Sequence, residues 1–193
     1  MLLRITLAVA LGVVSLAQTL PLDSTKSTKA QKVNAEAVTY KGRKAIRVTD
    51  ALNGADANED RLLVLPQTKF ENGTIEVDVA GEPAPGSGQG ARGFTGVAFR
   101  VDPAIAKFEC FYIRPTNGRA DDQVRRNHSV QYISFPDHPW HRLRKESPEK
   151  YETYADLVPG EWTKVKIEVM GRKAKLFVNG VAQPTLLVND LKH

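Results

Sequence analysis

Residues 162–180, WTKVKIEVMGRKAKLFVNG, decide the fold of this chain. The first half alternates apolar with charged side chains, Val165, Ile167 and Val169 against Lys164, Lys166 and Glu168. A period of two predicts a β-strand with one buried and one solvated face. Gly171 interrupts the pattern and KLFVNG resumes it, so we expect two antiparallel strands joined by a tight turn.

The same alternation recurs along most of the chain, and no segment shows a convincing helical period. The expected strands fall within residues 37–40, 44–50, 61–66, 69–81, 93–101, 107–115, 128–135 and 181–188. Short strands separated by Gly and Asn turns are typical of an antiparallel sandwich. The sequence therefore predicts an all-β fold, a two-sheet jelly-roll β-sandwich. With 193 residues the chain is long enough for one domain with a hydrophobic core.

The N-terminus reads MLLRITLAVALGVVSLAQ and has the composition of a secretory signal. Arg4 precedes an apolar run over residues 5–16, and Ser15 and Ala17 are the small residues that favour cleavage after Ala17. An uncleaved anchor would need roughly 20 apolar residues to span a bilayer. We expect a signal peptide over 1–17, a flexible leader over 18–35 and the sandwich over 36–193. The mature protein would then be exported, periplasmic or extracellular, with no membrane span.

The positive charge of the chain is concentrated in one region. The formal net charge is +5, and residues 114–145 alone carry a net +4. Such an excess indicates either a nucleic-acid patch or arginines used for short-range recognition. Because nucleic acid is an unusual partner for an exported protein, we expect short-range recognition and no nucleic acid.

Parity along two expected strands places polar side chains on one face. If Val97, Phe99, Phe111 and Ile113 point into the core, then Gly96, Ala98, Arg100, Cys110, Tyr112 and Arg114 share the other face. On the next strand His128, Tyr132 and Ser134 share a parity, and we expect them on that same polar face. Aromatic rings and forked donors on a rigid sheet suit sugars. The expected substrate-binding residues are Arg100, Tyr112, Arg114, Asn117, Arg126, His128, Gln131, Tyr132 and Trp140, the last in a loop.

Several segments resemble the concanavalin A-like lectin/glucanase superfamily, namely GTIEVDV, GFTGVAFR, FECFYIRPTNGR, RRNHSVQY, PGEWTKVKIEVMG and KLFVNG. More narrowly, they are similar to exported bacterial laminin-G-like proteins related to the 3-keto-disaccharide hydrolase domain. The resemblance covers residues 38–191. It implies a jelly roll whose concave sheet meets carbohydrate. Members commonly continue with a Gly-rich turn and further strands, so the resemblance also implies that C-terminal strands are missing here.

Two other functions stay open on sequence alone. A glycoside hydrolase would use carboxylates on the same face, with Glu109 and Glu152 as weak candidates. Two carboxylates about 5–9 Å apart across a groove would favour this function. A structural envelope interaction domain would instead use the arginines for bracing, with Asp121 and Asp122 paired to Arg119 and Arg125. No feature specifies the glycan or the oligomeric state.

No cofactor is expected. His128, His138, His141 and Asp137 lack a zinc-site spacing. Calcium is common on loop oxygens in the superfamily, and Asp102, Asn117, Asp121 and Asp122 could supply ligands, but no calcium-loop motif joins them. Cys110 is the single cysteine, so no intrachain disulfide forms, and its apolar context predicts a buried hydrophobe rather than a nucleophile.

Overall fold

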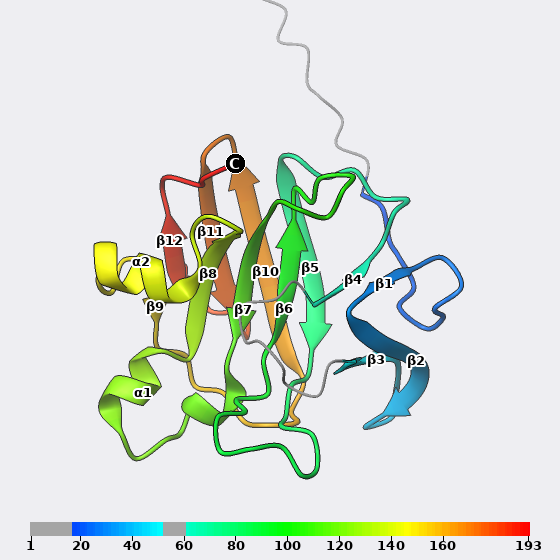
Figure 1. The fold of residues 1–193 in the computed structure, drawn as a ribbon, viewed down its shortest axis with the longest axis horizontal. Coiled ribbons are helices and arrows are strands. Elements are labelled where there is room, and N and C mark those ends of the chain that lie inside the picture. The colour runs from blue at the N-terminus through cyan, green and yellow to red at the C-terminus, as the bar shows by residue number, and fades with distance from the viewer. Residues whose placement is uncertain (1–16, 52–60) are drawn as a thin grey trace, which may run out of the picture.

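The computed structural model describes residues 17–51 and 61–193. Two four-stranded antiparallel sheets lie one over the other, as Figure 1 shows. The expected all-β sandwich is therefore confirmed. The predicted signal peptide falls on residues 1–16 and Ala17, so nearly all of it lies outside the described residues. Among the helices described, none is long and apolar enough to cross a bilayer.

The first sheet contains the strands that opened the sequence analysis. It is built from β5 (Gly73–Val79), β10 (Thr163–Met170), β11 (Lys173–Val178) and β12 (Leu186–Val188), in the order β12-β11-β10-β5. β10 and β11 pair in register with a tight turn at Gly171, as the alternation predicted. The apolar positions of β10 are buried and point toward the second sheet.

The second sheet carries the polar stretch. It is built from β6 (Thr95–Phe99), β7 (Phe108–Ile113), β8 (Val130–Phe135) and the short β9 (Glu152–Thr153), in that order. Each strand is antiparallel to its neighbour. One face of this sheet packs on the first sheet and the other turns outward, so successive side chains on each strand serve different surroundings.

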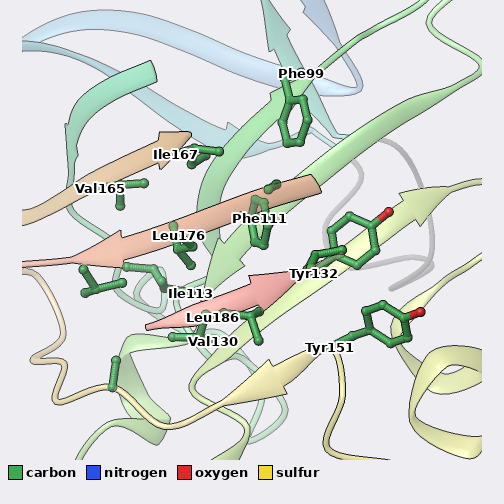
Figure 2. Packing of buried hydrophobic residues seen from close by; sticks show 14 of the residues in the cluster. Phe99, Phe111, Ile113, Val130, Tyr132, Tyr151, Val165, Ile167, Leu176 and Leu186 are labelled. Carbon is green, nitrogen blue, oxygen red and sulfur yellow. The ribbon is translucent and has the colours of Figure 1, made fainter. Parts of the chain in front are cut away.

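The core lies between the two sheets. Figure 2 shows the side chains that fill it, among them Phe99, Phe111, Ile113, Val130 and Tyr132 from one sheet and Val165, Ile167, Leu176 and Leu186 from the other. Phe99 and Phe111 stack with ring centroids 6.1 Å apart. Each fully buried side chain of this kind stabilises the fold by about 1.5–3 kcal/mol relative to exposure.

Two smaller two-stranded sheets lie beside the sandwich. β1 (Lys29–Gln31) pairs with β4 (Leu62–Val64), and β2 (Val33–Tyr40) pairs with β3 (Arg43–Asp50). The expected flexible leader over 18–35 is thus corrected, because it includes β1 and the start of β2. These strands are mostly exposed and are held by backbone pairing. Their sequence is therefore largely polar and does not show the apolar alternation of a half-buried strand.

The sequence analysis missed two short helices. They are α1 (Gln123–Asn127) and α2 (Trp140–Glu146), and a 3₁₀ turn covers Pro115–Asn117. Each helix is too short for a helical period to show, but local signals exist. Asp122 caps α1 by accepting a hydrogen bond from the backbone of Arg125 at 2.9 Å.

Trp140, expected in a loop, is therefore the first residue of α2. Pro139 precedes the helix at its N-cap. Arg142 and Glu146 form an i,i+4 ion pair of 2.8 Å on its exposed side. Leu143 is buried in the core cluster and anchors the helix.

Candidate functional site

A row of outward-facing residues crosses the second sheet. Backbone register aligns Gly96 with Tyr112, Tyr112 with Gln131, and Gln131 with Glu152, one from each of the four strands. Residues directly opposite one another share a face. The row therefore brings a phenol ring, an amide and a carboxylate together on the side of the sheet that points away from the core, which we call the outer face. Gln131 and Glu152 are nevertheless buried there by neighbouring residues.

The Tyr112 side chain lies against a strand position that has no side chain. A Cβ built on Gly96 would come within 2.5 Å of Tyr112 Cα and 2.2 Å of the Phe111 carbonyl oxygen. Both are backbone atoms, which cannot move aside cheaply. Gly96 is therefore required for this close approach of β6 to β7.

Arg114 is the buried centre of the polar end of the outer face. The residue is 5% exposed. Its Nη1 donates to the His128 carbonyl oxygen at 2.8 Å, and its Nη2 donates to Tyr112 Oη at 2.8 Å and to Gln131 Oε1 at 3.3 Å. Burial lowers the pKa of Arg114 from its ordinary value, partly offset by Tyr112. All of these partners are uncharged.

Two neighbouring aromatic rings pack against the Arg114 guanidinium. Its central carbon lies 4.9 Å from the Tyr112 ring centroid and 5.8 Å from that of Phe94. The two rings lie 5.9 Å apart and are tilted. Phe94 is 57% exposed, which is unusual for a phenylalanine and leaves a flat apolar ring at the surface. Sequence analysis missed Phe94, although it has the same parity as Gly96.

At the other end of the row, Glu152 is held by two basic groups. Arg144 donates to both carboxylate oxygens, with its Nε 2.8 Å from Oε1 and its Nη2 2.6 Å from Oε2. His128 Nδ1 lies 2.8 Å from Oε2, at ion-pair distance but out of hydrogen-bond alignment. Burial lowers the pKa of His128, as do Arg144 and Arg114, while Glu152 opposes them. His128 is therefore neutral at pH 7.

Trp140 borders this part of the outer face. The Arg144 guanidinium stacks over its ring at 4.8 Å from the centroid. Arg144 follows Trp140 by four residues on α2, which is the helical spacing that brings the two side chains together. Arg144 was also missed, because α2 was missed.

Tyr132 does not belong to the outer face, and that prediction is wrong. The register places it opposite Phe111, and it is fully buried between the sheets. Ser134 has the same parity and is also fully buried. The residues of β8 that do face outward are Gln131, Ile133 and Phe135. Tyr132 sits in the core because its hydroxyl finds a buried partner there, Glu109.

The outer face is not polar along its whole length. Phe108 and Phe135 stack at 5.0 Å beyond Cys110, and Phe108 is buried. This apolar end explains why both parities of β7 read as hydrophobic in sequence.

Arg100 lies away from the other predicted site residues. Arg100 follows the last residue of β6, and Arg114 follows the last residue of β7. Because the two strands are antiparallel, their last residues lie at opposite ends of the sheet. Arg100 donates to the backbone carbonyls of Glu71, Gly171 and His193 at 3.0, 2.6 and 2.7 Å. The structure thus gives Arg100 a bracing position.

Asn117 and Arg126 lie at the margin of the site. Asn117 is buried, donating to the His128 carbonyl at 3.1 Å and accepting from Arg125 Nε at 3.0 Å. Arg126 packs over the exposed ring of Tyr154 at 5.1 Å. Asp121 and Asp122 do not brace the arginines as expected, since Arg119 pairs with Asp156 and Arg125 bonds Asn117 and Thr116.

The two candidate catalytic carboxylates lie on opposite faces of the sheet. Glu109 is fully buried on the core side, where it accepts from Tyr132 Oη, whereas Glu152 lies on the outer face. They therefore cannot flank one substrate, as a glycosidase pair must.

The described residues of this site do not form a metal-binding cluster or a reactive thiol. Across residues 17–51 and 61–193, no group of three or more His, Cys, Asp or Glu side chains could hold a metal ion. Asp102 Oδ1 instead accepts from the backbone of Ala106 and Lys107. Burial and then Glu109 raise the pKa of Cys110 to about 12, so the thiol stays protonated.

A surface pocket of about 350 Å³ lies elsewhere, between the β2–β3 hairpin and the first sheet. It is lined by Arg43, Asp78, Trp162, Lys164, Asn179 and Gly180. Within it, Arg43 pairs with Asp78 at 2.8 Å and stacks on Trp162 at 5.4 Å.

The class that the structure defines is the antiparallel β-sandwich with an aromatic and arginine-rich outer face. No protein-family model, curated protein or solved structure matches the chain.

Proposed function

We propose that this chain is a carbohydrate-binding domain and that the outer face around Phe94, Tyr112 and Arg114 receives the sugar. The observation that carries the proposal is the exposed Phe94 ring beside Tyr112, with the buried Arg114 guanidinium in contact with both rings. Sugars present flat C–H surfaces that stack on aromatic rings and vicinal hydroxyls that match forked donors.

The rigidity of the platform supports the same function. Tyr112 is fixed by Arg114, and Arg114 is fixed by a backbone carbonyl and by Gln131. Gln131 in turn donates to the carbonyls of Tyr132 and Tyr151 at 2.9 and 3.1 Å. A preorganised surface loses little entropy when it binds, which favours recognition of a weakly hydrophobic ligand.

The resemblance to concanavalin A-like proteins adds support from sequence, because their jelly roll meets carbohydrate on one sheet. The proposal includes export, with residues 1–17 acting as the signal, so the sugar would be met in the periplasm or outside the cell. Fractionation of cells that express the full chain tests this part: mature protein starting at residue 18 in the exported fraction is expected, and an uncleaved cytoplasmic chain would contradict it.

A glycan array followed by calorimetry tests binding. Replacing Phe94 by alanine should weaken binding about tenfold, because an aromatic stacking contact contributes roughly 0.5–1.5 kcal/mol beyond its buried area. Met170→Ala is the matched control, since Met170 is an exposed apolar residue (75%) on the first sheet. The proposal fails if the wild-type domain binds no glycan, or if Phe94→Ala binds as tightly as Met170→Ala.

A further inference from the structure

The arginines of this protein divide into two groups by their partners. Six described arginines form ion pairs with a carboxylate: Arg43, Arg47, Arg61, Arg119, Arg142 and Arg144. Arg92, Arg114 and Arg125 do not, and neither do Arg100, Arg126 and Arg172. A guanidinium without a nearby carboxylate is ordinary at an exposed site but not in a buried one.

Arg92, Arg114 and Arg125 gather at one corner of the outer face. Arg92 and Arg125 are close enough that their mutual repulsion lowers the pKa of Arg92, after the larger effect of burial. The Arg92 carbonyl accepts from the backbone N–H of Thr116 at 3.4 Å, and Arg125 donates to the Thr116 carbonyl at 3.3 Å. The corner thus concentrates positive charge around the platform described above.

Glu152, the carboxylate in the row described above, cannot neutralise this corner. Glu152 is 5% exposed, and Arg144 occupies both of its oxygens. The pair formed by Glu152 and Arg144 is already neutral, and His128 beside it is uncharged at pH 7. Arg114 is therefore left as a buried cation whose partners are a carbonyl, a phenol and an amide.

Arg114 also retains donor capacity. A guanidinium has five N–H donors, and within the described part of the chain Nε of Arg114 has no hydrogen-bond partner. His128, Tyr112 and Gln131 take three of the five donors, including both of Nη2. The remaining Nε–H of this fixed guanidinium can give a carboxylate oxygen one charge-assisted hydrogen bond.

We propose that the saccharide bound at the outer face is acidic, and that Arg114, assisted by Arg92, binds the carboxylate of a uronic acid unit. This inference rests on the proposed carbohydrate-binding function. The Phe94 and Tyr112 rings contact the sugar ring, while the arginines read the charge that distinguishes a uronate from the neutral sugar of the same stereochemistry.

Matched sugars test the inference directly. Oligomers of galacturonate, glucuronate and mannuronate are each compared by calorimetry with the same oligomer as its methyl ester, which keeps the shape and removes the charge. At least one acid should bind about tenfold tighter than its ester, since a charge-assisted contact is about twice as strong as a neutral one. The difference should shrink as NaCl rises from about 0.05 to about 0.5 M.

Three variants connect the effect to these residues. Arg114→Gln should abolish the preference for acid over ester, and Glu152→Gln should raise the affinity for the acid about threefold, because it frees Arg144 and removes a repelling carboxylate. Arg119→Gln, which alters an exposed ion pair with Asp156, should change neither. Should Arg114→Gln not fold, Arg92→Gln provides the same comparison at a less buried residue.

The outcomes separate the two proposals. Esters and acids that bind equally overturn the acidic assignment, and sulfated sugars that bind more tightly than uronates overturn the uronate assignment. Both results leave carbohydrate binding in place. If no sugar of either kind binds, the proposed function itself fails.

Discussion

Tyr132 donates a hydrogen bond of 2.5 Å to Glu109 between the two sheets, where neither residue has exposed surface. The other oxygen of Glu109 accepts from the backbone N–H of His193 at 2.6 Å. Figure 2 shows Tyr132 between Phe111 and Tyr151, whose ring centroids lie 5.4 and 5.5 Å from it. Burial and then Glu109 raise the pKa of Tyr132. The pair therefore fixes a polar contact inside an apolar core.

Replacing Tyr132 by phenylalanine should destabilise the protein without affecting sugar binding. The change leaves one oxygen of a buried carboxylate without its donor, which costs about 1–3 kcal/mol. Urea unfolding measures the loss. Tyr154→Phe is the control, because Tyr154 is 39% exposed and should change stability by less than about 0.5 kcal/mol. Equal stability of the two variants would contradict the role of this hydrogen bond.

Replacing Arg100 by lysine should likewise lower stability and leave affinity unchanged. Lysine cannot reach three carbonyls with one ammonium group as the guanidinium fork does, and we expect a loss of about 1–3 kcal/mol in the free energy of unfolding. Arg142→Lys, in an exposed ion pair with Glu146, should have almost no effect. A drop in sugar affinity for Arg100→Lys would restore Arg100 to the binding site.

Adding one methyl group at Gly96 should disturb both stability and binding. The new Cβ would overlap the backbone of β7 beneath Tyr112, so the strands must separate locally, at a cost of about 1–3 kcal/mol. Gly88→Ala is the matched control, since a Cβ at Gly88 meets nothing within 4 Å. Thermal unfolding and calorimetry of both variants provide the comparison, and a Gly96→Ala protein as stable as the control would refute the close approach.

The Cys110 thiol should resist alkylation while the protein is folded. With a pKa of about 12, almost none of it is thiolate at pH 8, whereas an unfolded cysteine with a pKa of about 8.5 is partly ionised. Iodoacetamide at pH 8 should therefore react roughly a thousandfold faster in concentrated urea than in buffer. Comparable rates in the two conditions would show that the thiol is exposed.

Asp190 should make stability fall at acid pH. Burial opposes its ionisation, but hydrogen bonds from Tyr151, Lys192 and Lys150 outweigh burial and lower its pKa from 3.8 to about 2. Because the folded value lies below the unfolded one, the contribution is fully present above about pH 4 and disappears as the pH falls toward 2.

Comparison with Asp190→Asn isolates this effect. The variant should be less stable by about 1–2 kcal/mol at pH 7, an amount reduced by partial solvent exposure of the carboxylate, and equal to wild type near pH 2. Urea unfolding at a series of pH values measures it. A difference that stays constant between pH 7 and 2 would mean that the carboxylate charge is not responsible.

Much of the sandwich could be predicted from sequence because its strands are half-buried. In β10, Val165, Ile167 and Val169 face the core and alternate with Lys164, Lys166 and Glu168, so the period of two appears directly. The outward placement of Tyr112 and Arg114 could be predicted for the same reason, since Phe111 and Ile113 between them are core residues.

The face of β8 could not be predicted, because hydrophobicity does not identify its buried side. Tyr132 is polar enough to suggest the surface, yet Glu109 from the adjacent strand satisfies its hydroxyl within the core. Ile133 looks like a core residue, yet it lies beside Cys110 on the outer face. Only the strand register distinguishes these cases. Arg144 was missed for a related reason, since α2 is too short to show a periodic pattern.

The strand row formed by Gly96, Tyr112, Gln131 and Glu152 has a practical consequence for engineering. Along β7 and β8, residues that point outward alternate with residues that fill the core, so a combinatorial library confined to outward positions other than Phe108 and Phe135 would leave the packing between the two sheets intact. Retargeting this sandwich to another ligand would therefore require substitutions at only a few outward-facing positions of the second sheet, with Gly96 left unchanged.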